Sequence, residues 1–236
     1  MHAALEELLH ARAPQGYGGR FYGVYSALVT DIADPDGQGR VRVRLPWSPD
    51  TGDASYEAWA RLVTLMGGAD RGTWFVPDVE DEVLVVFEGG DARRPYVLGG
   101  LWNGTDAPPE AMDSGGENNL KVIKSRNGVT VTLDDTQGSE RLALTTPGGQ
   151  SLTLADGPGR IELADSNGNT VELSSSGITI TASAKVSVTA SQVEVSAGMV
   201  SVSAGMSRFS GVVQSDTNIT NSTVSSSQTP CAGSIW

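Results

Sequence analysis

The sequence predicts an all-β fold in two parts, a small N-terminal barrel and a long repeat region that several chains must share. The chain has five tryptophans, five tyrosines and four phenylalanines, and only Phe209 and Trp236 among them follow Trp102. The first half alternates apolar and polar residues between turns, whereas the second half repeats short apolar pairs. A single-chain core normally buries large aromatic side chains. The second half must therefore bury its apolar surface in another way.

Residues 1–18 are expected to form a separate N-terminal segment. Within it, residues 3–12 read AALEELLHAR and place leucines at helical spacing, which predicts a short helix. Pro14 and the glycines that follow would stop it. A docking helix for a partner and a frayed terminal helix both fit this pattern.

Residues 19–103 are predicted to form an OB-like barrel of the Greek-key type. The clearest strand is 40–45, where Val41, Val43 and Leu45 alternate with three arginines. Five short strands joined by turns rich in Gly, Pro and Asp are typical of such barrels. The expected strands are 22–29, 40–45, 59–66, 82–88 and 95–101.

Residues 104–125 are expected to be a linker and the start of a needle, and 126–236 the needle itself. Pairs of the form V-x-V or L-x-L recur along it, first at steps of about ten residues and later at seven or eight. VSVTASQ, VEVSAGM and VSVSAGM follow one another over 186–206. The apolar residues stand at positions one and three of each heptad, which is strand periodicity and excludes a coiled-coil seam.

The repeat region predicts an intertwined homotrimeric β-helix. Each repeat offers too few inward apolar residues for one chain to enclose a core, and its strand edges would stay unpaired. Three chains wound together solve both problems, with each strand pairing with the other two chains. Roughly twelve strands per chain at ~4.8 Å each predict a needle on the order of 50–60 Å long. A single-chain β-helix is the rival, but it needs coils of ~20 residues or more. The predicted trimer core consists of Ile178, Ile180, Val186, Val188, Val193, Val195, Val200 and Val202.

Few residues could support catalysis or metal binding. Both histidines, His2 and His10, lie in the N-terminal segment, and Cys231 is the single cysteine. No triad or metal-ligand pair follows from these positions. We therefore expect no catalytic residues, no metal site and no cofactor. The acidic cluster at 78–82 and the acidic residues at 34–36 and 134–135 are interpreted as solvated turns.

The charge balance disfavours nucleic acid as a partner, since the net charge is -12. Arg40, Arg42 and Arg44 on one face of an OB-like barrel nevertheless keep a nucleic-acid-binding protein as an alternative. The competing interpretation pairs them with acidic groups of a neighbouring subunit or a hub. A second alternative is a β-helical enzyme that degrades glycans. It would need stacking aromatic residues, and the sequence has none between Trp102 and Phe209.

Several phrases over 23–103 resemble a known family. They are DPDGQGRVRVRLPW at 34–47, WAR at 59–61, PDVEDEVLVVF at 77–87, GD at 90–91 and PYVLGGLWN at 95–103. In this order they resemble the OB-like domain of the phage baseplate assembly protein V, Vgr and gp5-like spike family of contractile injection systems. With the repeat region, the resemblance covers nearly the whole chain.

The resemblance implies a structural, non-enzymatic, homotrimeric central spike of a phage-tail-like injection machine. Such a spike caps the inner tube through a hub and pierces the target envelope, touching the membrane only mechanically. The gp27-like hub is expected as a separate polypeptide, because no hub-like domain precedes the barrel. A PAAR-type protein is expected at the tip, where Ile235 and Trp236 would contribute to the contact.

The sequence also sets an expectation for where the protein acts. No signal peptide is recognisable, so synthesis and assembly are expected in a bacterial cytoplasm. Function would then follow in a virion, an intracellular particle or a released one. A phage tail, a type VI secretion apparatus and an extracellular injection particle stay open.

Overall fold

The computed structural model describes residues 20–46, 56–222 and 224. These residues form β-strands and one short 3-10 helix, which confirms the all-β prediction. The chain divides into two compact units, Met1–Ala184 and Lys185–Trp236. The predicted helix at 3–12, Cys231 and the tip residues Ile235 and Trp236 lie outside the described residues. None of the helical segments described is long and apolar enough to cross a membrane.

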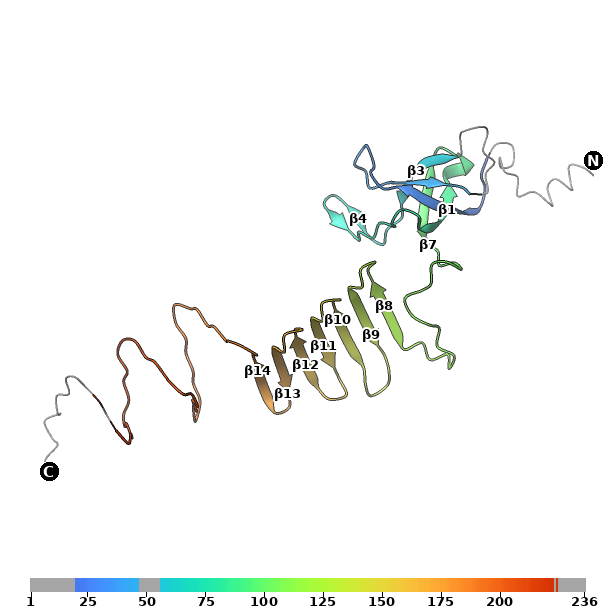
Figure 1. Cartoon of the computed structure of the whole chain (residues 1–236). Helices are drawn as coiled ribbons and strands as arrows, with labels where there is room; N and C mark the ends of the chain where they lie inside the picture. Colours follow the sequence, from blue (N-terminus) through green and yellow to red (C-terminus); the bar gives the residue numbers. More distant parts are fainter. Residues whose placement is uncertain (1–19, 47–55, 223, 225–236) are drawn as a thin grey trace, which may run out of the picture. The chain divides into compact units, whose positions relative to one another are not determined.

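The N-terminal part is a closed five-stranded barrel with the order β1-β2-β3-β7-β6, seen at the upper right of Figure 1. Its strands are β1 (Val24–Asp31), β2 (Val41–Arg44), β3 (Glu57–Leu62), β6 (Glu82–Phe87) and β7 (Pro95–Gly100). Neighbouring strands are antiparallel except β3 and β7, which are parallel. Each strand overlaps one of the five predicted runs, and the closed barrel confirms the OB-like prediction.

Alternation places the barrel core. Val41 and Val43 of β2 are fully buried and Leu45 is nearly so, as the strand period requires. From the facing strand β6, Val83 and Val85 point into the same core. Four aromatic rings pack together at one part of this core, with centroids 5.0 to 6.1 Å apart. They belong to Phe21, Tyr25, Tyr56 and Phe87.

The predicted strand 59–66 ends at Leu62. The chain then forms a small hairpin, β4 (Gly67–Gly68) and β5 (Arg71–Gly72). The Thr64 hydroxyl donates a 2.8 Å hydrogen bond to the Thr73 carbonyl across the base of this hairpin. The 3-10 helix η1 (Glu88–Gly90) makes the turn between β6 and β7.

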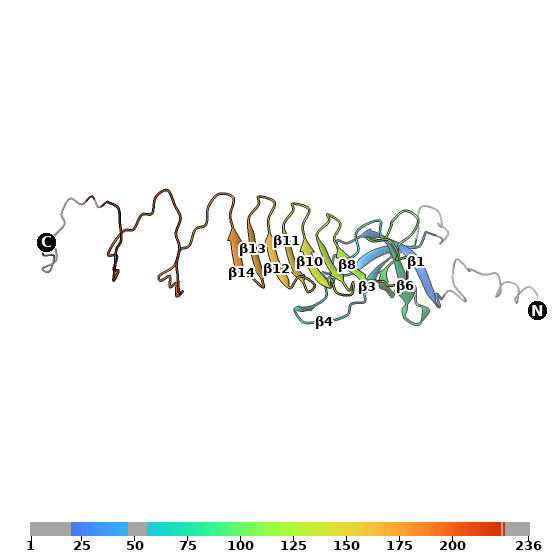
Figure 2. The same ribbon diagram turned by 90° about the horizontal axis from the view of Figure 1, so that it is seen from below.

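The repeat region begins with a seven-stranded antiparallel sheet in strict chain order, drawn as a single layer in Figures 1 and 2. The strands are β8 (Leu120–Lys124), β9 (Thr130–Asp134), β10 (Arg141–Thr145), β11 (Ser151–Ala155), β12 (Arg160–Ala164), β13 (Thr170–Ser174) and β14 (Gly177–Thr181). Short turns at 147–149 and 165–169 connect β10 to β11 and β12 to β13. Gly149 (φ +83°) and Gly168 (φ +82°) take the left-handed conformation that such tight connections need.

Strand pairing in this sheet corrects one prediction. We expected each strand to pair with the other two chains, but β8 to β14 pair with their neighbours in the same chain. The physical reason is local: each connection is a short turn, so the next strand returns beside the previous one and satisfies its backbone groups at once.

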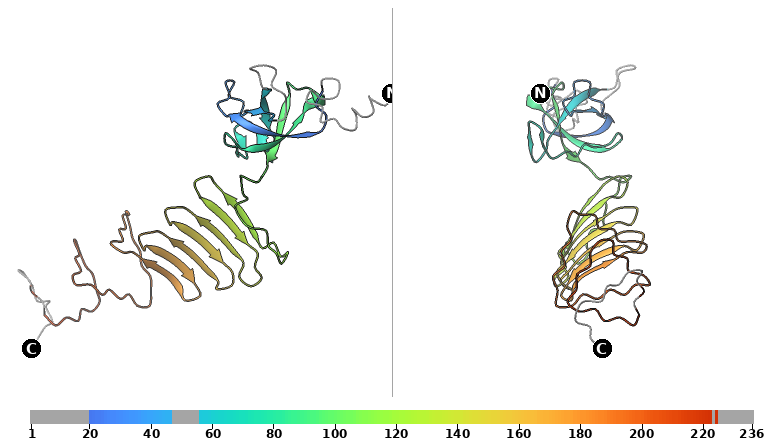
Figure 3. Two further views of the ribbon diagram at one scale, coloured as in Figure 1. Left: turned by 45° about the vertical axis from the view of Figure 1, so that its right-hand side comes forward. Right: turned by 90° about the vertical axis from the view of Figure 1, so that its left-hand side faces the viewer.

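The second unit begins at Lys185 and carries the heptads. No strand is assigned to its described residues, and the expected count of about twelve strands per chain is not reached in the chain as described. The backbone stays open and bends at intervals, as the orange and brown trace in Figure 3 shows. A β-strand is defined by its hydrogen-bonded neighbour, and this segment finds none among the described residues of its own chain.

Candidate functional site

From β9 to β14 the sheet gathers its leucine, isoleucine and valine side chains on one face, in two continuous rows, and Ile123 of β8 extends one of them. Cross-strand register fixes this arrangement, because directly opposed residues share a face. One row holds Leu133, Leu142, Leu154, Ile161, Leu173 and Ile178. The other holds Ile123, Val131, Leu144, Leu152, Leu163, Val171 and Ile180. We call these two rows the apolar face.

The apolar face lacks a cover among the described residues of the single chain. Ile178 and Ile180 are 70% and 63% exposed, and many other members of the two rows are also exposed. Fully burying one such side chain contributes roughly 1.5–3 kcal/mol relative to leaving it in water. Two rows of this length are far larger than the apolar patches that monomeric proteins usually expose. An exposed apolar surface of this size is typical of one half of a protein–protein interface.

From β9 to β14 the opposite face is mostly polar and carries ion pairs. The Arg160 guanidinium lies 2.9 Å from the Glu162 carboxylate and 3.7 Å from that of Glu172, which is the cross-strand neighbour of Glu162. Without Arg160, the two opposed carboxylates would repel each other. Arg141 similarly pairs with Asp134 at 3.2 Å. This face can therefore stay in water.

The predicted trimer-core residues are divided between the two units. Ile178 and Ile180 of β14 end the two rows of the apolar face. The six valines at 186, 188, 193, 195, 200 and 202 lie in the second unit, and each is exposed in the single chain. Their burial in a trimer stays a prediction.

Arg40, which precedes β2, and Arg42 within β2 form ion pairs with acidic residues of the same barrel domain. Arg40 Nη2 lies 2.6 Å from the carboxylates of both Asp34 and Asp36, and its guanidinium lies over the Trp59 ring. Arg42 pairs with Glu57 of β3 at 2.7 Å. Both interpretations from the sequence assigned these arginines a partner in another molecule, either nucleic acid or the acidic groups of a neighbouring subunit or hub. In the structure, Arg40 and Arg42 are paired within their own chain. The acidic partners could have been found in the sequence, since DPD precedes Arg40 by a few residues.

Asp34 organises the loop between β1 and β2. Its carboxylate accepts backbone N–H bonds from Asp36, Gln38 and Arg40 at 2.8 to 3.1 Å, as well as the side-chain bonds of Arg40. The Arg40 hydrogen bond, aided by these backbone donors, holds the pKa of Asp34 well below its ordinary value. The loop is a self-contained turn, as expected for the acidic residues at 34–36.

The acidic cluster at 78–82 is a turn that leads into β6, as expected. The Asp81 carboxylate accepts the Asp78 backbone N–H at 2.8 Å, and Glu82 accepts a side-chain bond from Asn103. Asp135 bonds Lys121 at 2.7 Å. Among the described residues, no three His, Cys, Asp or Glu side chains are grouped so that they could hold a metal ion.

The fold and the apolar face define the class of protein. It is an all-β protein with a closed barrel and a second β-region whose apolar face is suited to association with other copies. Comparison with known families agrees. Residues 25–102 match the type VI secretion system/phage-baseplate injector OB domain. Residues 141–205 match the phage baseplate V C-terminal trimerisation domain, which supports a homotrimer. The two matches confirm the resemblance to the phage baseplate assembly protein V and Vgr spike family.

The curated relatives include spike proteins of type VI secretion. VgrG2a of Pseudomonas aeruginosa is 31% identical over 122 residues, covering 49% of this chain and 14% of the relative. VgrG3 of Vibrio cholerae is 24% identical over 128 residues, covering 50% of this chain and 13% of the relative. The chain thus spans a small part of the curated relatives that it matches.

Proposed function

We propose that this chain is the structural subunit of a homotrimeric central spike in a contractile, phage-tail-like injection machine. The observation that carries the proposal is the open apolar face of the sheet, which lies in the region matched by the trimerisation domain. Three copies would turn their apolar faces toward a common axis and their ion-paired faces toward water. The result is a stiff prism rather than a binding groove.

The mechanical role follows from this design. The barrel would seat on a hub at the end of the inner tube, and the needle would point toward the target envelope. On contraction the trimer would transmit force along its axis, with no chemical step. The spike names of the relatives and the injector OB domain support this role. The pairing of Arg40 and Arg42 within the barrel gives no support to a nucleic-acid-binding function.

The first test is the mass of the purified chain in solution. We expect multi-angle light scattering at micromolar concentration to give three times the 24.6 kDa of one chain. The reason is that the apolar face and the heptad valines are exposed in one chain and find no cover among its described residues. A folded, stable monomer at that concentration would contradict the proposal.

The second test concerns the tip. We propose that a small PAAR-type protein caps the needle and that Ile235 and Trp236 form part of its seat, since they are the only bulky apolar residues after Val224. Deleting 234–236 should leave the trimer mass unchanged, because the heptads lie upstream, and should weaken capture of the cap in a pulldown. Equal capture by the full-length and the shortened chain would contradict this role.

A further inference from the structure

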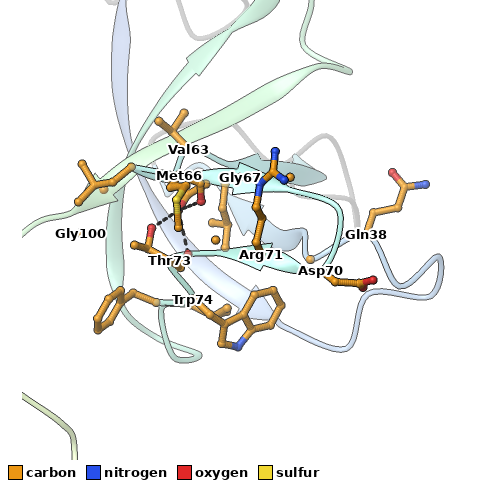
Figure 4. A pocket seen from close by; sticks show the side chains of 18 residues that line it. Gln38, Val63, Met66, Gly67, Asp70, Arg71, Thr73, Trp74 and Gly100 are labelled. Carbon is orange, nitrogen blue, oxygen red and sulfur yellow. Dashed lines mark hydrogen bonds between the residues drawn. The ribbon is translucent and has the colours of Figure 1, made fainter.

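The connection between β3 and β6 exposes a group of large apolar side chains. Leu65 is 97% exposed, Trp74 77% and Phe75 74%, and Met66 is also exposed. These four residues frame a hollow of about 780 Å³ whose other wall includes Gly99 and Gly100 at the end of β7 (Figure 4). We call residues 65–75 the apolar hairpin. Trp and large aliphatic residues in one exposed group are typical of a contact surface.

The apolar hairpin is held in place before any partner arrives. Besides the Thr64 bond at its base, the Thr73 backbone N–H donates to the Met66 carbonyl at 3.0 Å, and Gly67 pairs with Gly72. The Trp74 ring lies against Gly39: a Cβ there would come within 3.3 Å of the ring. Gly39 belongs to the loop that Asp34 organises. A fixed tryptophan loses little side-chain entropy on binding, which favours its use as an anchor.

A second surface lies on the outside of the barrel. Strand β6 is apolar on both faces: Val83 and Val85 fill the core, while Leu84 and Val86 point outward. Val86 faces Val24 of β1, which is 59% exposed. A strand with water on one side normally alternates apolar and polar residues, and an apolar run on both faces is typical of a strand covered on both. We call this surface the outer strip. It consists of Val24, Leu28, Leu84, Val86 and Leu98.

We propose that the apolar hairpin of one copy packs on the outer strip of the next copy around the three-fold axis. The proposal rests on the homotrimer proposed above and adds a collar interface between barrels. The two surfaces come from different elements, so the contact is head-to-tail, and three such contacts close a ring that leaves no free apolar end.

A second copy fits these surfaces better than an unrelated partner because it is always present. The linker 103–119 joins each barrel to the trimerising region, and even fully extended its 17 residues span at most about 60 Å. Tethering of this kind gives effective concentrations in the millimolar range. At that concentration, even a modest apolar interface forms.

The test uses the full-length chain with Cys231→Ser as background and one new cysteine on each surface. Leu65→Cys and Leu84→Cys in the same chain, treated with a short bismaleimide, are expected to give covalent trimers on a denaturing gel. Either substitution alone should give no such ladder, because like surfaces do not meet. Leu65→Cys together with Leu98→Cys serves as a second pair in case Leu84→Cys disturbs folding.

Labelling rates separate the possible outcomes. In the trimer, a maleimide dye should label Leu65→Cys at least tenfold more slowly than Arg93→Cys, an exposed site on the β6–β7 turn. If the chain is trimeric but Leu65→Cys and Arg93→Cys are labelled at equal rates and no cross-linked ladder forms, then the collar interface alone is overturned. The hub would then be the favoured partner of both surfaces. A chain that is not trimeric by light scattering would overturn the proposed function and the collar interface together.

Discussion

A chain carrying Val195→Asp is expected to lose its needle. Val195 occupies the third position of the heptad VEVSAGM, and the predicted register turns it toward the three-fold axis. The substitution would place three carboxylates together in a dry core. Each buried charge costs several kcal/mol before their mutual repulsion is added. The measurement is the thermal midpoint and the mass of the trimer, both of which should fall strongly.

The matched control for this variant is Ser201→Asp. Ser201 holds the position in its heptad that Glu194 holds in the previous one, where a carboxylate is already present. We expect the Ser201→Asp trimer to melt within a few degrees of the unaltered protein. If Val195→Asp behaves like this control, then the assigned register of the heptads is wrong.

The second large effect is expected at the sheet. Leu144→Glu introduces a carboxylate into the apolar face between Val131 and Leu152, its cross-strand neighbours. Burial of three such charges against other copies should prevent association, because a buried charge without a partner costs several kcal/mol. Light scattering is expected to show loss of the trimer, while the barrel core, which shares no residue with this face, keeps its own thermal transition.

Ala143→Glu is the matched control in the same strand. Ala143 is flanked by Thr132 and Thr153 on the polar face, so its carboxylate would remain in water and meet no opposed acid. This variant should stay trimeric with a nearly unchanged melting temperature. Dissociation of Ala143→Glu, or a stable Leu144→Glu trimer, would reverse the assignment of the two faces.

The barrel was largely predictable from local patterns. Alternation in 40–45 placed Val41, Val43 and Leu45 inside, and turn residues placed the strand ends to within a few positions. The hairpin after Leu62 was missed because residues 59–66 were interpreted as one continuous strand. Its formation depends on Thr64 meeting Thr73, nine residues away, which no periodicity reveals.

For the ion pairs of the barrel, the sequence identified the arginines but not their acidic partners. The arginines of 40–44 were recognised as one face, but their partners were sought in other molecules. Asp34 and Asp36 reach Arg40 because the intervening turn folds back, and Glu57 reaches Arg42 because β2 and β3 are neighbours. Charge alone does not determine such pairs, since a salt bridge depends on distance in the folded chain.

The sequence by itself determined the secondary-structure class, the division into barrel and repeats, and which side chains of each repeat share a face. These follow from the two-residue period of a strand, which is a property of the backbone. Only the tertiary structure decided which strands are neighbours, and it paired β8 to β14 within one chain. The number of residues between successive apolar pairs did not distinguish pairing within one chain from pairing between chains. The step from Val171 to Ile178 is seven residues long, as in the heptads, and yet β13 and β14 form a hairpin within one chain. The reason is that strands pair through N–H and C=O groups that nearly every residue carries, so the pattern shows what must be buried but not which strand lies beside it.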